Sequence, residues 1–289
     1  MKTKIIHKEP TVLLGAKGFI GKAISKVLEN NSVDYFSLGR DECDLLDFKN
    51  TEAYFKKFNK TPLKVIFLSS IKRTRDDSEI SMEKNIEMVG NFVKATKNNN
   101  LLTCIFMSSV DVYDQRSGLP LSEESDLYPD NFYAISKYCS ELILNLANQI
   151  EVLTILRLPG VYGIEDTDDS IISKFVSSIH NNEEIVLTQE GSQLRDYLYA
   201  DDIGEVINKL LESPKSGVFN LSSGKSLSIA SMVDIISGEL NKKAFIKRLD
   251  SNVTTNDITI LNDKILEEIP GISFTSMENG IKRFVNENL

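Results

Sequence analysis

Tyr133 and Lys137 are the residues whose types and spacing suggest chemistry most directly. Residues four apart lie on one face of a helix, so the ammonium of Lys137 can approach the phenol of Tyr133. A nearby cation favours the phenolate and lowers a pKa that is ordinarily about 10. A phenol whose pKa falls to about 7 can act as a general acid or base near neutrality. The pair therefore predicts a proton-transfer centre, although a solvated helix face carries the same spacing by chance.

A glycine turn near the N-terminus predicts a dinucleotide site to accompany this centre. The apolar run 11–14 predicts a buried strand, which leads into Gly15, Gly18 and Gly21 and then into an amphipathic helix. The glycines allow a tight turn and close approach to a pyrophosphate, and the helix N-terminus supplies oriented N–H groups. Strand, turn and helix in this order are the context that a dinucleotide fingerprint needs, with a plain glycine turn as the alternative.

The end of the second predicted strand, residues 33–38, bears on the choice of cofactor. An NAD site ordinarily has an acidic residue about 20 positions after the glycines, where it binds the ribose 2′-hydroxyl. This chain has Gly39 and Arg40 there. Because an arginine can pair with a 2′-phosphate, the sequence favours NADP(H). NAD(H) stays the alternative, since Asp41 is adjacent and Arg40 could instead stack on the adenine.

Serines follow two further predicted strands. Ser69 and Ser70 come after the apolar run 63–68, and Ser109 comes after the run 101–107. Ligands bind beyond the carboxyl ends of the strands in open parallel sheets, so we expect these hydroxyls to face the ligand. A serine turn without any function is the simpler alternative.

The alternation of strands and helices predicts an α/β fold, with a doubly wound parallel sheet (Rossmann) and a smaller C-terminal substrate lobe. The expected dinucleotide-binding domain spans 1–163, with 196–221 returning to it, and the expected lobe spans 164–195 and 222–289.

Composition excludes several classes of function. A net charge of -9 and a pI near 5.0 argue against general nucleic-acid binding. No apolar run reaches the roughly 18 residues that a membrane span needs. Three widely spaced cysteines and two histidines form no metal pattern, disulfide framework or histidine-based triad. We therefore expect a cytoplasmic protein with no metal and with neither a nucleic acid nor a membrane as partner.

The order of these segments resembles the extended short-chain dehydrogenase/reductase family, of the NAD-dependent epimerase/dehydratase type that modifies nucleotide sugars. The segments that carry the resemblance are the glycine turn, Ser109, Tyr133 with Lys137, and Arg195-Asp196 ahead of Asp202, supported by Asn85, 156–163 and 219–221. The resemblance covers about residues 10 to 240.

The resemblance implies a role for each matched residue. Ser109 and Tyr133 would hydrogen-bond the reacting sugar oxygen, and Tyr133 would pass the proton while hydride moves to or from the nicotinamide. Lys137 would bind the nicotinamide ribose and lower the tyrosine pKa, and the backbone after Pro159 would meet the carboxamide. Arg195 would hold the substrate diphosphate, unless it only forms a salt bridge with a neighbouring aspartate.

Two sets of site residues are therefore expected. The cofactor-binding set is Gly15, Lys17, Gly18, Phe19, Ile20, Gly21, Gly39, Arg40, Asp44, Leu45, Leu68, Ser69, Ser70, Asn85, Lys137, Pro159 and Val161. The catalytic residues are Ser109, Tyr133 and Lys137, and the substrate-binding set is Ser109, Asp111, Tyr133, Gly160 and Arg195.

Three departures from the family pattern narrow the reaction. Val110 and Asp111 stand where a 4,6-dehydratase usually has an Asp-Glu pair, which disfavours dehydration. Gly160 replaces the usual Asn and Ile164 the usual Pro, which puts one substrate phosphate contact in doubt. The segment 39–47 is similar to that of NADPH-using sugar-nucleotide reductases. Together the departures favour a ketoreductase, or an epimerase-reductase, over a dehydratase, with reduction of a 4-keto nucleotide sugar as the leading hypothesis.

Two other functions stay open at this point. One is a nucleotide-sugar 4-epimerase with tightly bound NAD, which moves a hydride away and back. The other is a non-catalytic NAD(P)-sensing protein, although a sensor needs none of Ser109, Tyr133 and Lys137. The family analogy also implies a homodimer formed through the helix after Asn85 and the helix that bears Tyr133. The sequence names neither the sugar nor the nucleotide base, because specificity lies in loops without a readable code.

Overall fold

The computed structural model describes residues 9–116, 118–164, 166, 170–249 and 256–288. The chain folds as two compact units. The first comprises the described parts of Met1–Val112, Pro129–Arg157 and Gly204–Phe219, and the second those of Tyr113–Tyr128, Leu158–Ile203 and Asn220–Leu289.

A six-stranded sheet forms the centre of the first unit, with the strand order β10-β5-β4-β3-β1-β2. The strands are β1 Thr11–Leu14, β2 Tyr35–Leu38, β3 Leu63–Phe67, β4 Leu101–Ser109, β5 Ile150–Leu158 and β10 Gly217–Asn220. β1 pairs in parallel with both β2 and β3, so that Val12 lies between Phe36 and Val65. β3 pairs in parallel with β4. All four residues of β1 are buried, as expected for a central strand covered on both faces. The predicted Rossmann-like α/β fold is confirmed.

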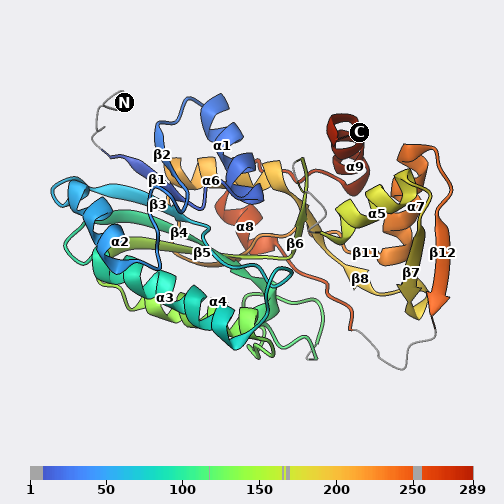
Figure 1. Ribbon diagram of the computed structural model, residues 1–289, viewed down its shortest axis with the longest axis horizontal. Helices are drawn as coiled ribbons and strands as arrows, with labels where there is room; N and C mark the ends of the chain where they lie inside the picture. The colour runs from blue at the N-terminus through green and yellow to red at the C-terminus, as the bar shows by residue number, and fades with distance from the viewer. Residues whose placement is uncertain (1–8, 117, 165, 167–169, 250–255, 289) are drawn as a thin grey trace. The chain divides into compact units, whose positions relative to one another are not determined.

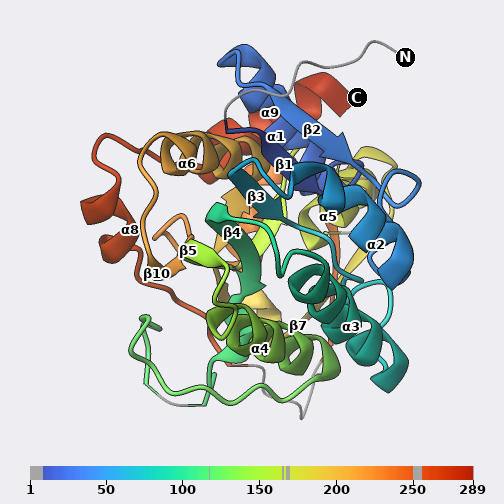
Figure 2. The same ribbon diagram turned by 90° about the vertical axis from the view of Figure 1, so that its left-hand side faces the viewer.

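Helices cover both faces of this sheet, as Figures 1 and 2 show. On one face lie α2 Phe48–Phe55, α3 Glu79–Ala95 and α4 Phe132–Asn145, and on the other lie α1 Phe19–Asn30 and α6 Ala200–Glu212. α6 approaches α1 so closely at Gly204 that a Cβ there would lie 2.6 Å from Cγ2 of Val27. This arrangement is the double winding that the sequence predicts.

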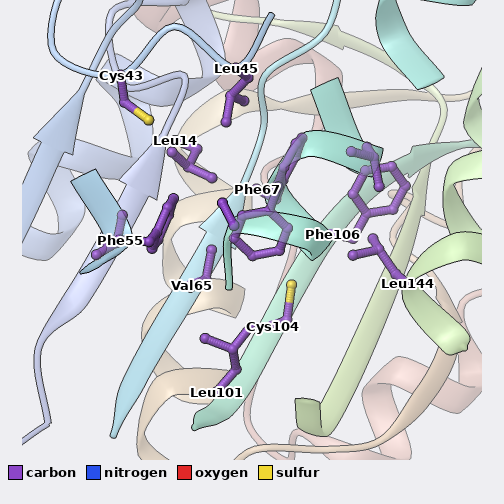
Figure 3. Packing of buried hydrophobic residues seen from close by; sticks show 14 of the residues in the cluster. Leu14, Cys43, Leu45, Phe55, Val65, Phe67, Leu101, Cys104, Phe106 and Leu144 are labelled. Carbon is purple, nitrogen blue, oxygen red and sulfur yellow. The ribbon is translucent and has the colours of Figure 1, made fainter. Parts of the chain in front are cut away.

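An aromatic cluster on the α2–α3 face of the sheet holds β3 and β4 in place (Figure 3). The ring of Phe92 in α3 meets Phe55 at 5.4 Å and Phe67 at 5.2 Å between centroids, both edge to face. Phe67 at the end of β3 lies 5.8 Å from Phe106 of β4. Such pairs contribute about 0.5–1.5 kcal/mol beyond the area that they bury. The cluster therefore fixes the strand ends from which the site residues extend.

The second unit has short paired strands and its own apolar core. β6 Gly160–Tyr162 pairs in parallel with β9 Tyr197–Tyr199, β7 Glu184–Thr188 pairs in parallel with β12 Phe245–Leu249, and β8 Leu194–Arg195 pairs antiparallel with β11 Leu227–Ser228. The helices of this unit are α5 Ile171–His180, α7 Ile229–Leu240, α8 Asp263–Glu268 and α9 Met277–Asn288. α5, α7 and α9 bury a common core that includes Phe175, Met232 and Ile281.

One difference from the expected elements lies at the end of β4. The strand continues to Ser109, two residues beyond the predicted 101–107, and a 3-10 turn, Val110–Val112, follows directly. The reason is that the hydroxyl of Ser108 has a buried partner, Glu141, so a polar residue can stay inside the sheet.

None of the helices described by the structure combines the length and the apolar character of a membrane span.

Candidate active site

The glycine turn after β1 has the geometry that close approach to a ligand requires. Gly15 has φ of +88°, and its N–H and that of Ala16 donate to the carbonyl of Leu38 at 2.9 and 3.0 Å. A Cβ on Gly21 would lie 2.4 Å from the carbonyl oxygen of Gly15. Two glycines are therefore required, Gly15 for its conformation and Gly21 for the packing of α1 against the turn.

The N-terminus of α1 is suited to an anion. Its N-cap is Gly18, no side chain caps it among the residues that the structure describes, and its first turn has no acidic residue. The amides of this turn and the helix dipole favour negative charge there. The arrangement fits the pyrophosphate of a dinucleotide.

Lys17 lies across the end of β2 within an acidic cluster. A Cβ on Gly39 would lie 2.4 Å from Cδ of Lys17, so glycine at this position admits the lysine side chain. The ammonium of Lys17 lies 2.9 Å from carboxylate oxygens of both Asp41 and Glu42, and Glu42 also accepts the N–H of Gly39 at 2.8 Å. These contacts raise the pKa of Lys17.

Arg40 is paired with Asp44 rather than isolated. Its Nε lies 3.2 Å from Oδ2 of Asp44, and about three quarters of the arginine side chain is exposed. An exposed ion pair contributes only about 0–1 kcal/mol, so a phosphate can compete with it. The two expected ribose residues, Gly39 and Arg40, thus lie beside Lys17 at the carboxyl end of β2.

Asn85 connects the end of β3 to α4. Its amide accepts the N–H of Ile71 at 2.7 Å and donates to the carbonyl of Ile71 at 3.1 Å. It also donates to the hydroxyl of Ser136, the neighbour of Lys137, at 3.2 Å. Its side chain thus holds the backbone after Ser69 and Ser70, and the expected contact of Asn85 with the cofactor stays a prediction.

Tyr133 and Lys137 both lie on α4, as expected. Asn131 caps this helix, and the N–H of Tyr133 donates to Asp77 at 2.9 Å. The Lys137 ammonium is buried, donates to the carbonyl of Met107 at 2.7 Å and lies 5.5 Å from the centroid of the Tyr133 ring. α4 therefore brings the two side chains together at the end of β4.

The electrostatics of this pair differ from the simplest expectation. Burial lowers the pKa of Lys137 to about 8, and Glu141 opposes that shift. Burial raises the pKa of Tyr133 above its ordinary value, and the charge of Asp111 adds to the rise. The groups that lower the pKa of Tyr133 are Arg73 and the hydroxyl of Ser70. The expected lowering of the Tyr133 pKa by Lys137 is therefore not found: burial dominates, and the cation that acts on the phenol is Arg73.

A buried charge network lies below Lys137 on the same helix. Glu141 accepts two hydrogen bonds from Arg157 of β5, at 3.1 and 2.7 Å, and one from the hydroxyl of Ser108. The side chains of Arg157 and Glu141 are only 4% and 5% exposed. Since Ser108 precedes Ser109, the network ties the end of β4 to α4.

Ser109 and Asp111 lie at the other side of this strand end. The N–H of Asp111 donates to Oγ of Ser109 at 3.2 Å, and Oδ2 of Asp111 lies 3.1 Å from Nη1 of Arg73. Burial raises the pKa of Asp111, whereas Arg73 lowers it. The predicted catalytic residues Ser109, Tyr133 and Lys137 thus all lie in the first unit, around the end of β4.

The remaining predicted substrate and cofactor residues, from Pro159 to Val161 and Arg195, lie in the second unit. Gly160 pairs with Tyr197, and a Cβ on it would lie 2.3 Å from the tyrosine ring, so the ring requires glycine there. Nη1 of Arg195 donates to the carbonyls of Leu194 and Asn256, both at 2.7 Å. The side chain of Asp196 accepts the N–H of Ser223, and that of Asp202 accepts the N–H and the hydroxyl of Thr275.

The sequence reasoning missed Arg73, Asp77, Glu141 and Arg157. Glu141 had a readable signal, because it continues the four-residue row of Tyr133 and Lys137 along α4. The other three come close to the site only through the fold. Within the described part of the chain, no group of three or more His, Cys, Asp or Glu side chains could hold a metal ion.

The sequence of the chain is similar to those of known proteins. The profile of the NAD dependent epimerase/dehydratase family matches residues 11–222. Protein CapI of Staphylococcus aureus is 24% identical over 323 residues, covering 95% of this chain and 97% of that protein. The dTDP-4-dehydro-6-deoxyglucose reductase of Escherichia coli is 25% identical over 314 residues, covering 96% and 97%.

Solved structures share the fold. The structure of the UDP-glucose 4-epimerase of Thermus thermophilus in complex with NAD has a TM-score of 0.80 at 19% identity, covering 96% of this chain and 98% of that one.

Proposed function

Because the chain belongs to the NAD dependent epimerase/dehydratase family, we propose that it is an NAD(P)-dependent oxidoreductase that reduces a 4-keto nucleotide sugar. The observation that carries the proposal is the placement of Tyr133 and Lys137 on one face of α4, with the ammonium 5.5 Å from the ring centroid, at the strand end that bears Ser109. Val110 and Asp111 in place of an acid pair favour reduction over elimination. The similarity to a dTDP-4-dehydro-6-deoxyglucose reductase supports the same choice.

Each residue of the first unit has a task in this reaction. Gly15, Gly18 and the first turn of α1 would hold the pyrophosphate, and the Lys137 ammonium would hold the nicotinamide ribose. The bound reduced cofactor supplies the hydride. Ser109 would hydrogen-bond the sugar carbonyl oxygen, and the O–H bond of Tyr133 would break as its proton passes to that oxygen. Solvent then reprotonates the phenolate.

The proposed cofactor is NADP(H). Lys17 and Arg40 place two cations at the end of β2, where exposed Asp41 holds the first and partly exposed Asp44 the second, and a 2′-phosphate can displace these carboxylates. We expect NADPH to bind more tightly than NADH, and Lys17→Met to reduce that preference. An equal preference in the wild-type protein would overturn the assignment.

A nucleotide-sugar 4-epimerase with tightly held NAD is the second candidate. The observation that favours it is the cluster of Asp41 and Glu42 around Lys17, which neutralises one of the two cations. These carboxylates lie beside Gly39, where an NAD site usually has its acidic residue.

One experiment separates the two candidates. The purified protein is incubated with NADPH or NADH and a panel of 4-keto nucleotide sugars, and the loss of nicotinamide absorbance is followed. A reductase consumes added cofactor in proportion to product. Protein that carries NAD from purification and interconverts 4-epimers without added cofactor would contradict the reductase and support the epimerase. Arg195→Met in the same assay should raise KM, because the proposed task of Arg195 is to bind the diphosphate.

We also propose that the chain forms a homodimer through α3 and α4. Ile80, Leu142 and Leu146 on or directly after these helices are exposed, and Leu146 is 78% exposed. Exposed apolar side chains on neighbouring helices suit a helical interface. The mass in solution, measured by light scattering, should be twice that of the chain, and Leu142→Glu with Leu146→Glu should reduce it to one chain.

A further inference from the structure

Arg73 lies on a well-fixed segment between β3 and α3. The N–H groups of Arg75 and Asp76 donate to the carbonyl of Lys72, at 3.0 and 3.1 Å. The hydroxyl of Ser81 donates to the carbonyl of Asp76, at 3.0 Å. The segment therefore has its own internal hydrogen bonds at both ends.

The same segment is attached to the helix that carries the proposed proton donor. Asp77 accepts the backbone N–H of Tyr133 at 2.9 Å. An acidic side chain at a helix N-terminus is stabilised by the dipole and by the N–H groups of the first turn. The segment that carries Arg73 therefore contacts the backbone of Tyr133 directly, through Asp77.

The guanidinium of Arg73 pairs with a partly buried carboxylate. Its Nη1 lies 3.1 Å from Oδ2 of Asp111, whose side chain is 20% exposed, while that of Arg73 is 53% exposed. The backbone N–H of Asp111 donates to Oγ of Ser109. Arg73 is therefore linked through one residue to the proposed catalytic serine.

The charged groups around the Tyr133 phenol come from several elements. Asp111 raises the pKa of Tyr133, and Arg73 and the hydroxyl of Ser70 lower it. Lys137 faces the ring from α4 at 5.5 Å. Asp77 and Asp130 act on Asp111, whose pKa they raise. Without Arg73, Asp111 would place an unbalanced negative charge beside the position where the phenolate forms.

We propose that Arg73 is a positioning residue for proton transfer, whose guanidinium neutralises Asp111 and stabilises the phenolate left when Tyr133 gives its proton to the sugar oxygen. The chemistry rests on the proposed function: the phenol O–H bond breaks, an O–H bond forms on the sugar, and the hydride comes from NAD(P)H. The phenol becomes a phenolate in this step, so the protein gains one negative charge. Arg73 is a half-exposed cation whose charge acts on this phenol.

Substitutions at Arg73 and at Asp111 should shift the pKa of Tyr133 in opposite directions. Arg73→Met should raise the pKa of Tyr133 and Asp111→Asn should lower it, each by about one unit, a tenfold change in proton affinity. The double substitution should return the pKa close to the wild-type value. Arg73→Lys keeps the charge and should shift it little. Arg75→Met removes the same charge from an exposed neighbour on the segment and should leave the pKa of Tyr133 unchanged.

The direct measurement is an ultraviolet titration of phenolate, taken as the difference between each protein and its Tyr133→Phe counterpart. This reading needs no turnover, so it stays valid even where the panel of keto sugars contradicts the proposed function. An unchanged Tyr133 titration in Arg73→Met, or an equal shift in Arg75→Met, would overturn the proposal.

Discussion

Glu141→Gln perturbs the buried network below Lys137 while it preserves side-chain length. In the wild-type protein the carboxylate accepts two N–H groups of Arg157, at 3.1 and 2.7 Å, and the hydroxyl of Ser108. Glutamine turns one of the two acceptors into a donor. The guanidinium of Arg157 then loses the negative charge of Glu141 in a place where its side chain is only 4% exposed.

The expected cost follows from this burial. Removal of one partner from a buried ion pair costs about 3–5 kcal/mol, and glutamine retains part of the hydrogen bonding, so we expect a loss of about 3 kcal/mol in the free energy of unfolding. Glu141 also raises the pKa of Lys137, so its neutralisation should move that pKa below about 8. A shift of one unit is worth about 1.4 kcal/mol in the balance between the two protonation states.

Urea unfolding and the pH dependence of kcat/KM test the two effects separately. The alkaline limb set by Lys137 should move to lower pH in Glu141→Gln. Ser108→Ala is the matched control, because it removes one hydrogen bond without a charge and should cost about 1 kcal/mol with the limb unmoved. The reasoning would be refuted if Glu141→Gln had the free energy of unfolding of the wild-type protein and an unmoved alkaline limb of kcat/KM.

Two further predictions concern Lys137 and the glycine turn. The pKa of Lys137 is about 8 in the folded protein and ordinarily 10.5, so the unfolded chain binds more protons between these values. This group's contribution to the free energy of unfolding should therefore rise with pH across that window, by about 3 kcal/mol in all. The stability difference between wild type and Lys137→Met should follow this rise, and a pH-independent difference would contradict it. Gly21→Ala should cost about 1–3 kcal/mol in urea unfolding and weaken nucleotide binding, because its Cβ would lie 2.4 Å from the backbone oxygen of Gly15. Gly90→Ala is the control, since a Cβ there meets nothing within 4 Å and should stabilise α3 by up to about 1 kcal/mol. Equal destabilisation by the two substitutions would contradict the packing argument.

Local sequence signals were sufficient for the parts of the fold that depend on local physics. The apolar run of β1, the glycines after it and the amphipathic face of α1 each follow from neighbouring residues, and together they predicted the dinucleotide turn. The i to i+4 spacing likewise predicted that Tyr133 and Lys137 share a face of one helix. The short helix α2 was not predicted, because its cap at Asp47 lies within a polar segment without a clear apolar period.

The electrostatics of the site depend on contacts between distant residues, and no local pattern encodes them. Arg73 and Asp111 are 38 positions apart, and their pairing depends on the order of β3 and β4 in the sheet. The desolvation that raises the pKa of Tyr133 is likewise a property of the packed structure. Sequence spacing alone suggested that Lys137 sets this pKa, whereas in the structure burial, Asp111, Arg73 and Ser70 act on it.

Tyr133→Phe tests the central claim most directly, because it removes the proposed proton donor and leaves the ring in place. With NADPH and the 4-keto nucleotide sugar that the wild-type protein turns over, kcat should fall by about 10²- to 10⁴-fold, the usual contribution of a general acid. NADPH affinity, measured by titration, should stay close to that of the wild-type protein, since the glycine turn and Lys137 remain. Turnover equal to wild type in Tyr133→Phe, with nucleotide binding intact, would contradict the account.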